Sequence, residues 1–166
     1  MVVELSPDYY LKNFNTMLEF VVKQYPDLIA ENEWAFIKSY QKLSDDAAKL
    51  FVRLCLRQKS IYFSEQLEYR EIASMNEALM ELNESDFILI NPLIEKEDLL
   101  QALTKVDLKY LFSNKKISHH LPKPQVVESI LVAYSSDVIY ELVFAAKTLI
   151  FKNKEKEVEA LLHFFF

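Results

Sequence analysis

The sequence predicts a mainly α-helical protein that contains a few short β-strands. Apolar residues recur at intervals of three and four in the longer segments, which is the spacing of one face of an α-helix. Two short runs of β-branched and aromatic residues, "SIYF" (60–63) and "FILI" (87–90), interrupt that spacing and predict strands. The chain contains no glycine. Because phosphate-binding loops and dinucleotide-binding turns need glycine, the composition argues against a P-loop, a Rossmann fingerprint and an ordinary EF-hand loop.

Three helices are predicted before the first strand. The first begins with Ser6 as its N-cap, Pro7 in its first turn and Asp8 beside the positive end of the helix dipole. Apolar side chains then follow at helical spacing up to Pro26, at Leu11, Phe14, Leu18, Val21 and Val22. The second helix covers about residues 31–42, and the third takes Ser44 as its N-cap and contains "LFVRLCLRQK" (50–59).

The order of elements then becomes strand, helix, strand. Between the strands at 60–63 and 87–90, we expect a helix that is capped by Ser64 and contains "EQLEYREIASMNEALMELN" (65–83). Helix, strand, helix, strand is typical of a winged-helix unit. A pair of short strands between the helices of a plain bundle would produce nearly the same order, so both architectures fit.

Residues 97–133 predict two short helices around an extended linker. Thr104 and Asp107 form a variant capping box at the first helix, and two prolines precede or begin the second, in "LPKPQVVESIL" (121–131). The linker "FSNKKISHH" (112–120) is polar and basic. The tail predicts two amphipathic helices separated near "KNKEKE" (152–157), and its apolar end leads us to expect that the natural polypeptide continues past Phe166.

These elements predict three consecutive domains. A helical, winged-helix-like domain would cover residues 1–95, a helix-linker-helix unit 96–135, and the start of a further helical region 136–166. The apolar region 126–151 carries four charged residues, so no membrane-spanning segment is predicted, and the N-terminus shows no secretory signal. The net charge of −6 argues against a uniformly basic nucleic-acid coat but permits a local basic patch.

One such patch is predicted on the third helix. At 100° per residue, Lys49, Arg53 and Arg57 lie within about 80° of one another on a helix that is otherwise apolar. A guanidinium group presents a planar fork that suits phosphate oxygens, so the stripe could hold a DNA backbone. Alternatively, Asp45 pairs with Lys49 and nearby glutamates neutralise both arginines as structural salt bridges.

Several blocks resemble the Fanconi-associated nuclease family in both order and spacing. They are "YYLKNF", "LSDDAAKLFVRLCLRQK", "LEYREI" and "LTKVDLKYL…LPKPQVVESIL", and the resemblance covers roughly residues 8–166. It implies a winged-helix-like DNA-binding domain followed by a SAP-like helix-linker-helix and then a helical repeat region. Members of this family end in a metal-dependent VRR-NUC nuclease domain and are similar to flap endonucleases and 5′ exonucleases of the phosphodiesterase I type that act in DNA repair.

The resemblance also implies site residues. Arg53 matches the arginine of the family's "VRL" block, Arg57 the next basic position, and Tyr10 and Tyr69 match tyrosines placed near the DNA backbone. Candidates for backbone contacts in the SAP-like unit are Lys115, Lys116 and Lys123. This chain departs from the family pattern at Gln58 and Ser64, where the family has basic residues, and "SHH" replaces a linker that commonly contains glycine.

The nuclease motif itself is not found in these residues. The family signature is a PD-then-ExK arrangement that holds divalent metal, Mg²⁺ or Mn²⁺, whereas no ExK on a strand follows either "PD" pair here. We therefore expect this chain to hold flap or branched DNA, to pack against the missing nuclease region and to be inactive alone. It would work in the cytoplasm of a bacterium or the nucleus of a eukaryote. The rival hypothesis is a helical protein-interaction module with no nucleic-acid role.

Overall fold

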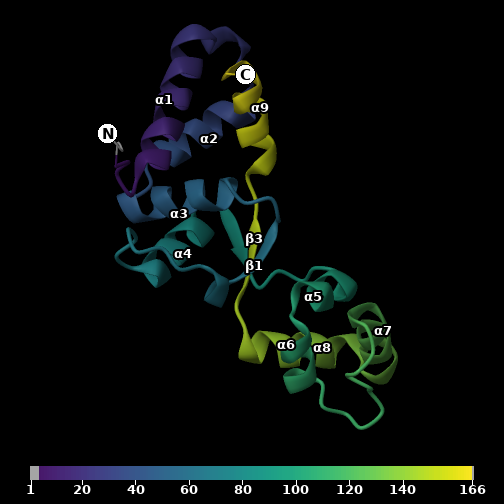
Figure 1. Ribbon diagram of the computed structural model, residues 1–166. Coiled ribbons are helices and arrows are strands. Elements are labelled where there is room, and N and C mark those ends of the chain that lie inside the picture. The colour runs from purple at the N-terminus through teal and green to yellow at the C-terminus, as the bar shows by residue number, and fades with distance from the viewer. Residues whose placement is uncertain (1–3, 166) are drawn as a thin grey trace. The chain divides into compact units, whose positions relative to one another are not determined.

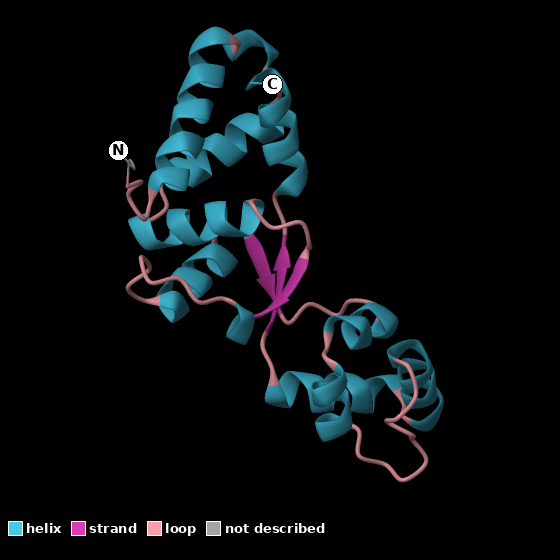
Figure 2. Cartoon of the chain, in the orientation of Figure 1, coloured by secondary structure: helices cyan, strands magenta, loops and turns pink. Residues whose placement is uncertain are grey.

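The computed structural model describes residues 4–165, and these are mainly helical, as predicted (Figures 1 and 2). The elements in chain order are α1 (Tyr9–Gln24), η1 (Pro26–Leu28), α2 (Glu31–Gln41), α3 (Asp45–Cys55), β1 (Ile61–Phe63), η2 (Ser64–Gln66), α4 (Met75–Glu84), β2 (Ile88–Ile90), α5 (Lys96–Ala102), α6 (Lys105–Leu111), α7 (Lys123–Ala133), α8 (Ser136–Ala146), β3 (Leu149–Lys152) and α9 (Glu155–Phe165). Residues 1–3 and Phe166, where the sequence predicts a continuing chain, lie outside the described residues.

Packing divides the chain into two compact units. Unit 1 consists of Met1–Ser60, Glu68–Leu89 and Phe151–Phe166, and unit 2 of Ile61–Leu67 and Ile90–Ile150. Unit 1 is therefore built from three separate stretches of sequence. The three consecutive domains predicted above divide the chain by sequence pattern, and that division stays a prediction.

Unit 1 has an aromatic core. Neighbouring rings lie 4.9–6.4 Å apart between centroids, mostly edge-on or tilted, which is a favourable arrangement for aromatic pairs. The rings belong to Phe14, Phe36, Tyr40, Phe51 and Phe87. They come from α1, α2, α3 and the start of the β2 segment, so this cluster fixes α3 against its neighbours.

The last helix, α9, packs against the first (Figure 1). Phe165 meets Phe20 edge-on at 5.5 Å, and Phe164 stacks on Tyr25 at 5.7 Å between ring centroids. The two tail helices predicted from the sequence are α8 and α9, but the strand β3 between them was not predicted. Leu149 and Ile150 are both fully buried, and a continuous apolar run does not show the alternation that distinguishes a strand from a helix.

Two of the predicted helix starts are wrong. Asp8, and not Ser6, is the N-cap residue of α1, and the Ser6 hydroxyl instead donates to Asp8 Oδ1 at 2.7 Å. Ser64 begins a short 3₁₀ turn, while α4 starts only at Met75, with Ser74 as its N-cap. The Ser44 cap of α3 is confirmed, since its hydroxyl accepts from the Ala47 amide at 3.3 Å.

Helices α3 and α4 cap each other. The amide and the hydroxyl of Ser44 both donate to Glu81 Oε2 at 2.9 Å, and the amide of Ser74 donates to Asp46 Oδ2 at 3.2 Å. Each helix thus supplies a carboxylate to the N-cap residue of the other. Since amides at helix starts have no partner within the helix, these bonds fix the relative position of the two helices as well as their ends.

The end of α4 shows how a chain without glycine makes a left-handed turn. Phe87 N–H donates to the Leu82 carbonyl at 2.9 Å and Asp86 N–H to the Asn83 carbonyl at 3.3 Å, which is a Schellman motif. The position that glycine usually occupies is taken by Asp86, with φ of 60°. Asn91 is likewise left-handed, with φ of 52°. Asparagine and aspartate are the residues that tolerate this conformation best after glycine.

The three short strands form one sheet in the order β1-β3-β2. Both strands predicted from the sequence are confirmed, as β1 and β2, but β3 lies between them. The amide of Ser64 donates to the Thr148 carbonyl and that of Lys152 to the Ser60 carbonyl, so β1 and β3 run antiparallel. The sheet is small, and helices make up most of the described chain (Figure 2).

Unit 2 contains the predicted helix-linker-helix, as α6 and α7. The capping box at α6 is present, because Thr104 Oγ1 accepts from the Asp107 amide at 3.1 Å and Asp107 Oδ2 accepts from the Thr104 amide at 3.2 Å. The core beneath it is apolar and includes the fully buried Leu108, Phe112 and Ile130. No single helix in residues 4–165 is long and apolar enough to cross a membrane; α7 and α8 reach that length only together, bent by 118°.

Candidate nucleic-acid interface

Helix α3 carries Lys49 and Arg53 of the predicted basic stripe, but the helix ends at Cys55 with Leu56 as its C-cap, so Arg57 lies in the bend that follows and not on the helix as predicted. Leu50 and Leu54 are fully buried on its inner side, while Arg53 and Arg57 are half-buried at the surface. The amphipathic pattern of the helix, with Ser44 at its start, therefore places the guanidinium group of Arg53 on the outer face of unit 1.

Arg53 makes cation–π contacts with two tyrosine rings. Its guanidinium carbon lies 4.1 Å from the centroid of the Tyr10 ring and 5.0 Å from that of Tyr69. On one edge, Nε and Nη2 both donate to Glu71 Oε1, at 2.8 and 2.7 Å. The side chain remains 32% exposed, so solvent still reaches part of the guanidinium group. Two cation–π contacts and a charged hydrogen-bonded pair together fix the orientation of this arginine.

Glu71 is the acceptor at the centre of this cluster. Its Oε1 atom also accepts from the Tyr10 hydroxyl at 2.7 Å, and the carboxylate side chain is only 10% exposed. Burial alone would raise the pKa of Glu71, but hydrogen bonds from the backbone, Tyr10 and Arg53 outweigh it and the pKa is lowered. Burial, followed by the bond to Glu71, raises the pKa of Tyr10. Arg53 and Tyr10 thus stay protonated and Glu71 ionised at neutral pH.

Arg57 lies in the bend that follows the end of α3, where its backbone N–H donates to the Leu54 carbonyl at 3.1 Å. Its guanidinium carbon is 5.7 Å from the Tyr69 ring centroid, so Tyr69 contacts both arginines. The structure therefore brings together the four residues of unit 1 that the sequence predicted as DNA contacts: Tyr10, Arg53, Arg57 and Tyr69. Their roles toward DNA stay a prediction.

A buried lysine supports the end of α3. Lys152 is 6% exposed, and its ammonium group donates to the carbonyls of Leu54 at 3.0 Å and Arg57 at 2.6 Å. Its counter-ion is Glu155, 3.1 Å away. A cation at a helix C-terminus interacts favourably with the dipole. Sequence reasoning missed Lys152 because it treated this stretch as part of a helical tail.

The structural alternative for the basic stripe is confirmed in part. Lys49 pairs with Asp45 at 2.7 Å, as that alternative requires, and its ammonium also donates to the Glu71 carbonyl at 3.3 Å. Arg53 pairs with Glu71. These pairs are not sealed from solvent, since the Arg53 side chain is one-third exposed. The stripe thus has a structural function in docking the 69–72 turn and still presents a cationic group at the surface.

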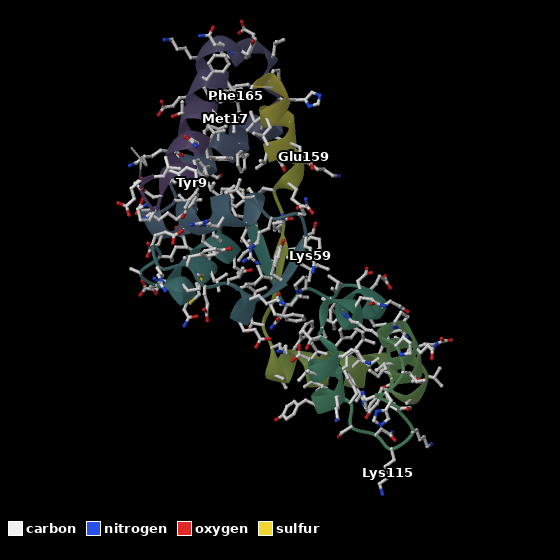
Figure 3. All side chains as sticks on the ribbon, in the orientation of Figure 1. Tyr9, Met17, Lys59, Lys115, Glu159 and Phe165 are labelled. Carbon is white, nitrogen blue, oxygen red and sulfur yellow. The ribbon has the colours of Figure 1, made fainter. Side chains whose placement is uncertain are left out.

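The predicted lysines of unit 2 lie in two places, with Lys115 and Lys116 adjacent in the linker and Lys123 at the start of α7. Lys115 and Lys116 are exposed in the linker between α6 and α7, and the Lys115 side chain extends away from the loop (Figure 3). Lys123 begins α7, and its ammonium group donates to the Gln101 carbonyl at 2.6 Å, at the end of α5. Lys123 therefore links two helices, whereas the linker lysines point into solvent.

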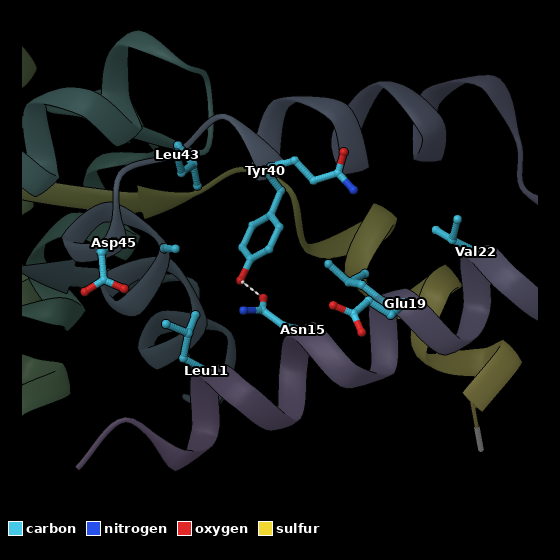
Figure 4. Close-up of a pocket in the computed structure, with 10 residues that line it drawn as sticks. Leu11, Asn15, Glu19, Val22, Tyr40, Leu43 and Asp45 are labelled. Atoms are coloured by element: carbon cyan, nitrogen blue, oxygen red, sulfur yellow. Dashed lines mark hydrogen bonds between the residues drawn. The ribbon is translucent and has the colours of Figure 1, made fainter. Parts of the chain in front are cut away.

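A hollow in unit 1 lies beside the start of α3 (Figure 4). It is lined by α1, α2 and the start of α3, and the Tyr40 hydroxyl donates to Asn15 Oδ1 at 2.7 Å within it. Glu19 and Asp45 belong to its lining. Two carboxylates repel a phosphate group, so this hollow does not extend the cationic site.

The described residues offer no cluster for a metal ion. No group of three or more His, Cys, Asp or Glu side chains in residues 4–165 has the geometry to hold one. Burial raises the pKa of the Cys55 thiol to about 12, so this cysteine is a protonated core residue at neutral pH. His119 instead braces the linker of unit 2, where its Nε2 donates to the Phe112 carbonyl at 2.9 Å.

The fold and the cluster together define a helical domain of the helix-turn-helix class with a small accessory sheet. Residues 8–89 match the family model described as "FAN1, HTH domain". They therefore belong to that domain family, and the chain is homologous to the N-terminal region of the Fanconi-associated nucleases.

Comparisons with individual proteins agree. The chain is 29% identical over 123 residues to the Fanconi-associated nuclease 1 homolog of Pseudomonas aeruginosa, covering 74% of this chain and 22% of that protein. It is 36% identical over 111 residues to Fanconi-associated nuclease 1 of Mus musculus, covering 64% of this chain and 11% of the mouse protein. A crystal structure of paFAN1 bound to DNA with a 2-nt 5′ flap and a gap matches with a TM-score of 0.84 at 24% identity, over 97% of this chain and 30% of that one. The chain thus spans about a fifth of the bacterial relative's length.

Proposed function

We propose that this chain is the DNA-binding N-terminal part of a structure-specific nuclease that acts in DNA repair. It holds flap or branched duplex by the phosphate backbone and positions it for a nuclease region outside these residues. Homology to Fanconi-associated nucleases and the fold shared with paFAN1 bound to 5′-flap DNA support this proposal.

The observation that carries the proposal is the cluster of Tyr10, Arg53, Arg57 and Tyr69 on the surface of an acidic protein. An orientated guanidinium group binds phosphate oxygens through a planar fork, and a tyrosine can donate to a phosphate or stack on a base. Arg53 on α3 and Arg57 just after it lie near tyrosine rings, so the cluster is suited to backbone contacts, and specificity would come from the shape of the DNA.

The SAP-like unit would add backbone contacts through its lysines. Lys115 and Lys116 extend from the exposed linker, and Lys123 lies at the start of α7. Cleavage and the divalent metal, Mg²⁺ or Mn²⁺, would belong to the nuclease region of the parent protein. Such a protein would work where chromosomal DNA is, in the bacterial cytoplasm or the eukaryotic nucleus.

The test is the salt dependence of binding to 5′-flap DNA. Arg53→Ala combined with Arg57→Ala should weaken binding and reduce the slope of log affinity against log salt by about one to two phosphate contacts. A full reduction by two is not expected, because Glu71 already neutralises part of the Arg53 charge.

The matched control removes two charges elsewhere on unit 1. Lys23 and Lys38 are both exposed, on α1 and α2, so replacing both by alanine changes the net charge equally. The slope of this control should stay close to that of the wild type. If the arginine double variant binds flap DNA as the wild type does, the cluster is not a phosphate site. If the wild type shows no salt-dependent binding, the protein-interaction alternative replaces the proposal.

A further inference from the structure

Glu71 is placed unusually for a carboxylate inside a phosphate-binding cluster. A surface glutamate there would simply repel DNA, but this side chain is 10% exposed and one oxygen, Oε1, accepts from three donors: Arg53 Nε, Arg53 Nη2 and the Tyr10 hydroxyl. The turn that carries it is also fixed, because Ile72 N–H donates to the Tyr69 carbonyl at 3.2 Å and Lys49 donates to the Glu71 carbonyl at 3.3 Å.

A phosphate group cannot easily replace this carboxylate. Displacement would leave a buried, ionised side chain without its three donors, and an uncompensated buried charge is strongly unfavourable. Glu71 therefore stays bound to Arg53 when a ligand approaches.

The geometry of Arg53 leaves room for both anions. A guanidinium group has five N–H donors in one plane, and the Nε–Nη2 edge is the one that faces Glu71. The guanidinium carbon lies over the Tyr10 and Tyr69 rings, and the pair with Glu71 uses Nε and Nη2, so the donors of Nη1 take no part in that pair. Because 32% of the side chain is exposed, we infer that a phosphate oxygen binds on the Nη1 side.

We propose that Glu71 is a positioning residue of the DNA site that presents the outer edge of Arg53 to a backbone phosphate and, by cancelling the arginine's charge, keeps the affinity low. The inference rests on the proposed function and specifies how that site is regulated. Sequence-independent affinity for DNA depends on how many phosphates the protein neutralises. Cancelling part of one arginine's charge therefore keeps backbone binding weak and readily reversible, which lets a nuclease search along DNA.

Two substitutions separate the two functions of Glu71. Glu71→Gln keeps the shape and an acceptor oxygen for Arg53 and Tyr10 but removes the negative charge. Glu71→Ala removes the charge and the acceptor together, so that Arg53 is no longer orientated. The control is Glu68→Gln, which makes the same charge change at an exposed neighbouring position.

The readout is affinity for 5′-flap DNA over a range of salt concentrations, with folding checked by circular dichroism. Glu71→Gln should steepen the slope by up to about one phosphate contact, which corresponds to roughly eightfold tighter binding at 0.1 M salt. Glu71→Ala should bind more weakly than Glu71→Gln at every salt concentration, and the control should match the wild type.

Each other outcome overturns the inference. If Glu71→Gln behaves like the control, Glu71 does not attenuate binding. If Glu71→Ala binds as tightly as Glu71→Gln, the carboxylate only competes with phosphate and positions nothing. Both results require that the wild type binds DNA and leave the proposed function intact. If the wild type fails to bind, the proposed function falls and this inference falls with it.

Discussion

Lys152 offers the sharpest test of what holds α3 in place. Replacing it by methionine keeps the length and apolar stem but removes a buried ammonium group with donors to two carbonyls and an ion pair to Glu155. Removing one partner of a buried ion pair costs about 3–5 kcal/mol. Glu155 is 39% exposed and keeps a bond from the Ser60 hydroxyl at 2.9 Å, so water and serine compensate it partly. We therefore expect Lys152→Met to lower the free energy of unfolding by about 3 kcal/mol, the lower end of that range.

The measurement is equilibrium unfolding in urea. The slope of the free energy of unfolding against urea concentration must be the same in variant and wild type, because only then does a shifted midpoint report a change in stability. Lys156→Met is the matched control, because Lys156 is exposed on α9 and should change the free energy of unfolding by less than about 0.5 kcal/mol. A loss for Lys152→Met of under about 1 kcal/mol would show that the ammonium group is not needed at the end of α3. The contact between Lys152 and the Arg57 carbonyl would then not be needed to hold Arg57 in place.

Three further predictions concern local features. Asp86→Gly should raise the free energy of unfolding by up to about 1 kcal/mol, because glycine adopts the left-handed conformation without strain; Asp86→Val should lower it. Thr104→Ala should lower the free energy of unfolding by about 1 kcal/mol and speed hydrogen exchange of the Asp107 amide. Unchanged exchange would show that the Thr104 hydroxyl does not cap α6. Burial opposes ionisation of Glu71, but the hydrogen bonds to its carboxylate lower its pKa below the ordinary 4.5. The ionised carboxylate therefore stabilises the fold fully above pH 4.5, and this stabilisation is lost as the pH falls through the lowered pKa. The stability difference between wild type and Glu71→Gln should therefore shrink in unfolding measured below about pH 4.5, and a constant difference would refute this.

Much of the fold could be predicted from local chemistry. Apolar spacing and caps found α1, α2, α3 and the helix-linker-helix, because each depends on residues close in sequence, such as Ser44 and Thr104 with the turns that follow them. The strand β3 and the late start of α4 could not be predicted in this way. Residues 64–74 are rich in helix-forming side chains, but the chain there turns to bind α3, and this tertiary contact overrides the local preference.

The site was predictable only in part, for a related reason. Arg53 follows from helical spacing, whereas Tyr10 and Tyr69 came from the family resemblance. The same spacing was wrong for Arg57, because α3 ends at Cys55. Glu71 was missed because a helix would place Tyr69 and Glu71 about 200° apart, so that both could not face Arg53. The turn at 69–72 brings both to the same side chain.

The packing of α9 on α1 also has a consequence for synthesis on the ribosome. Phe20 and Phe165 are far apart in the sequence, yet their rings touch. At translation rates of about 5–20 residues per second, the apolar face of α1 waits on the order of 10 s for its last partner to emerge. Unit 2, made from an almost continuous stretch, is fully synthesised within that interval. During synthesis, the face of α1 that packs on α9 therefore stays uncovered while the whole of unit 2 is made.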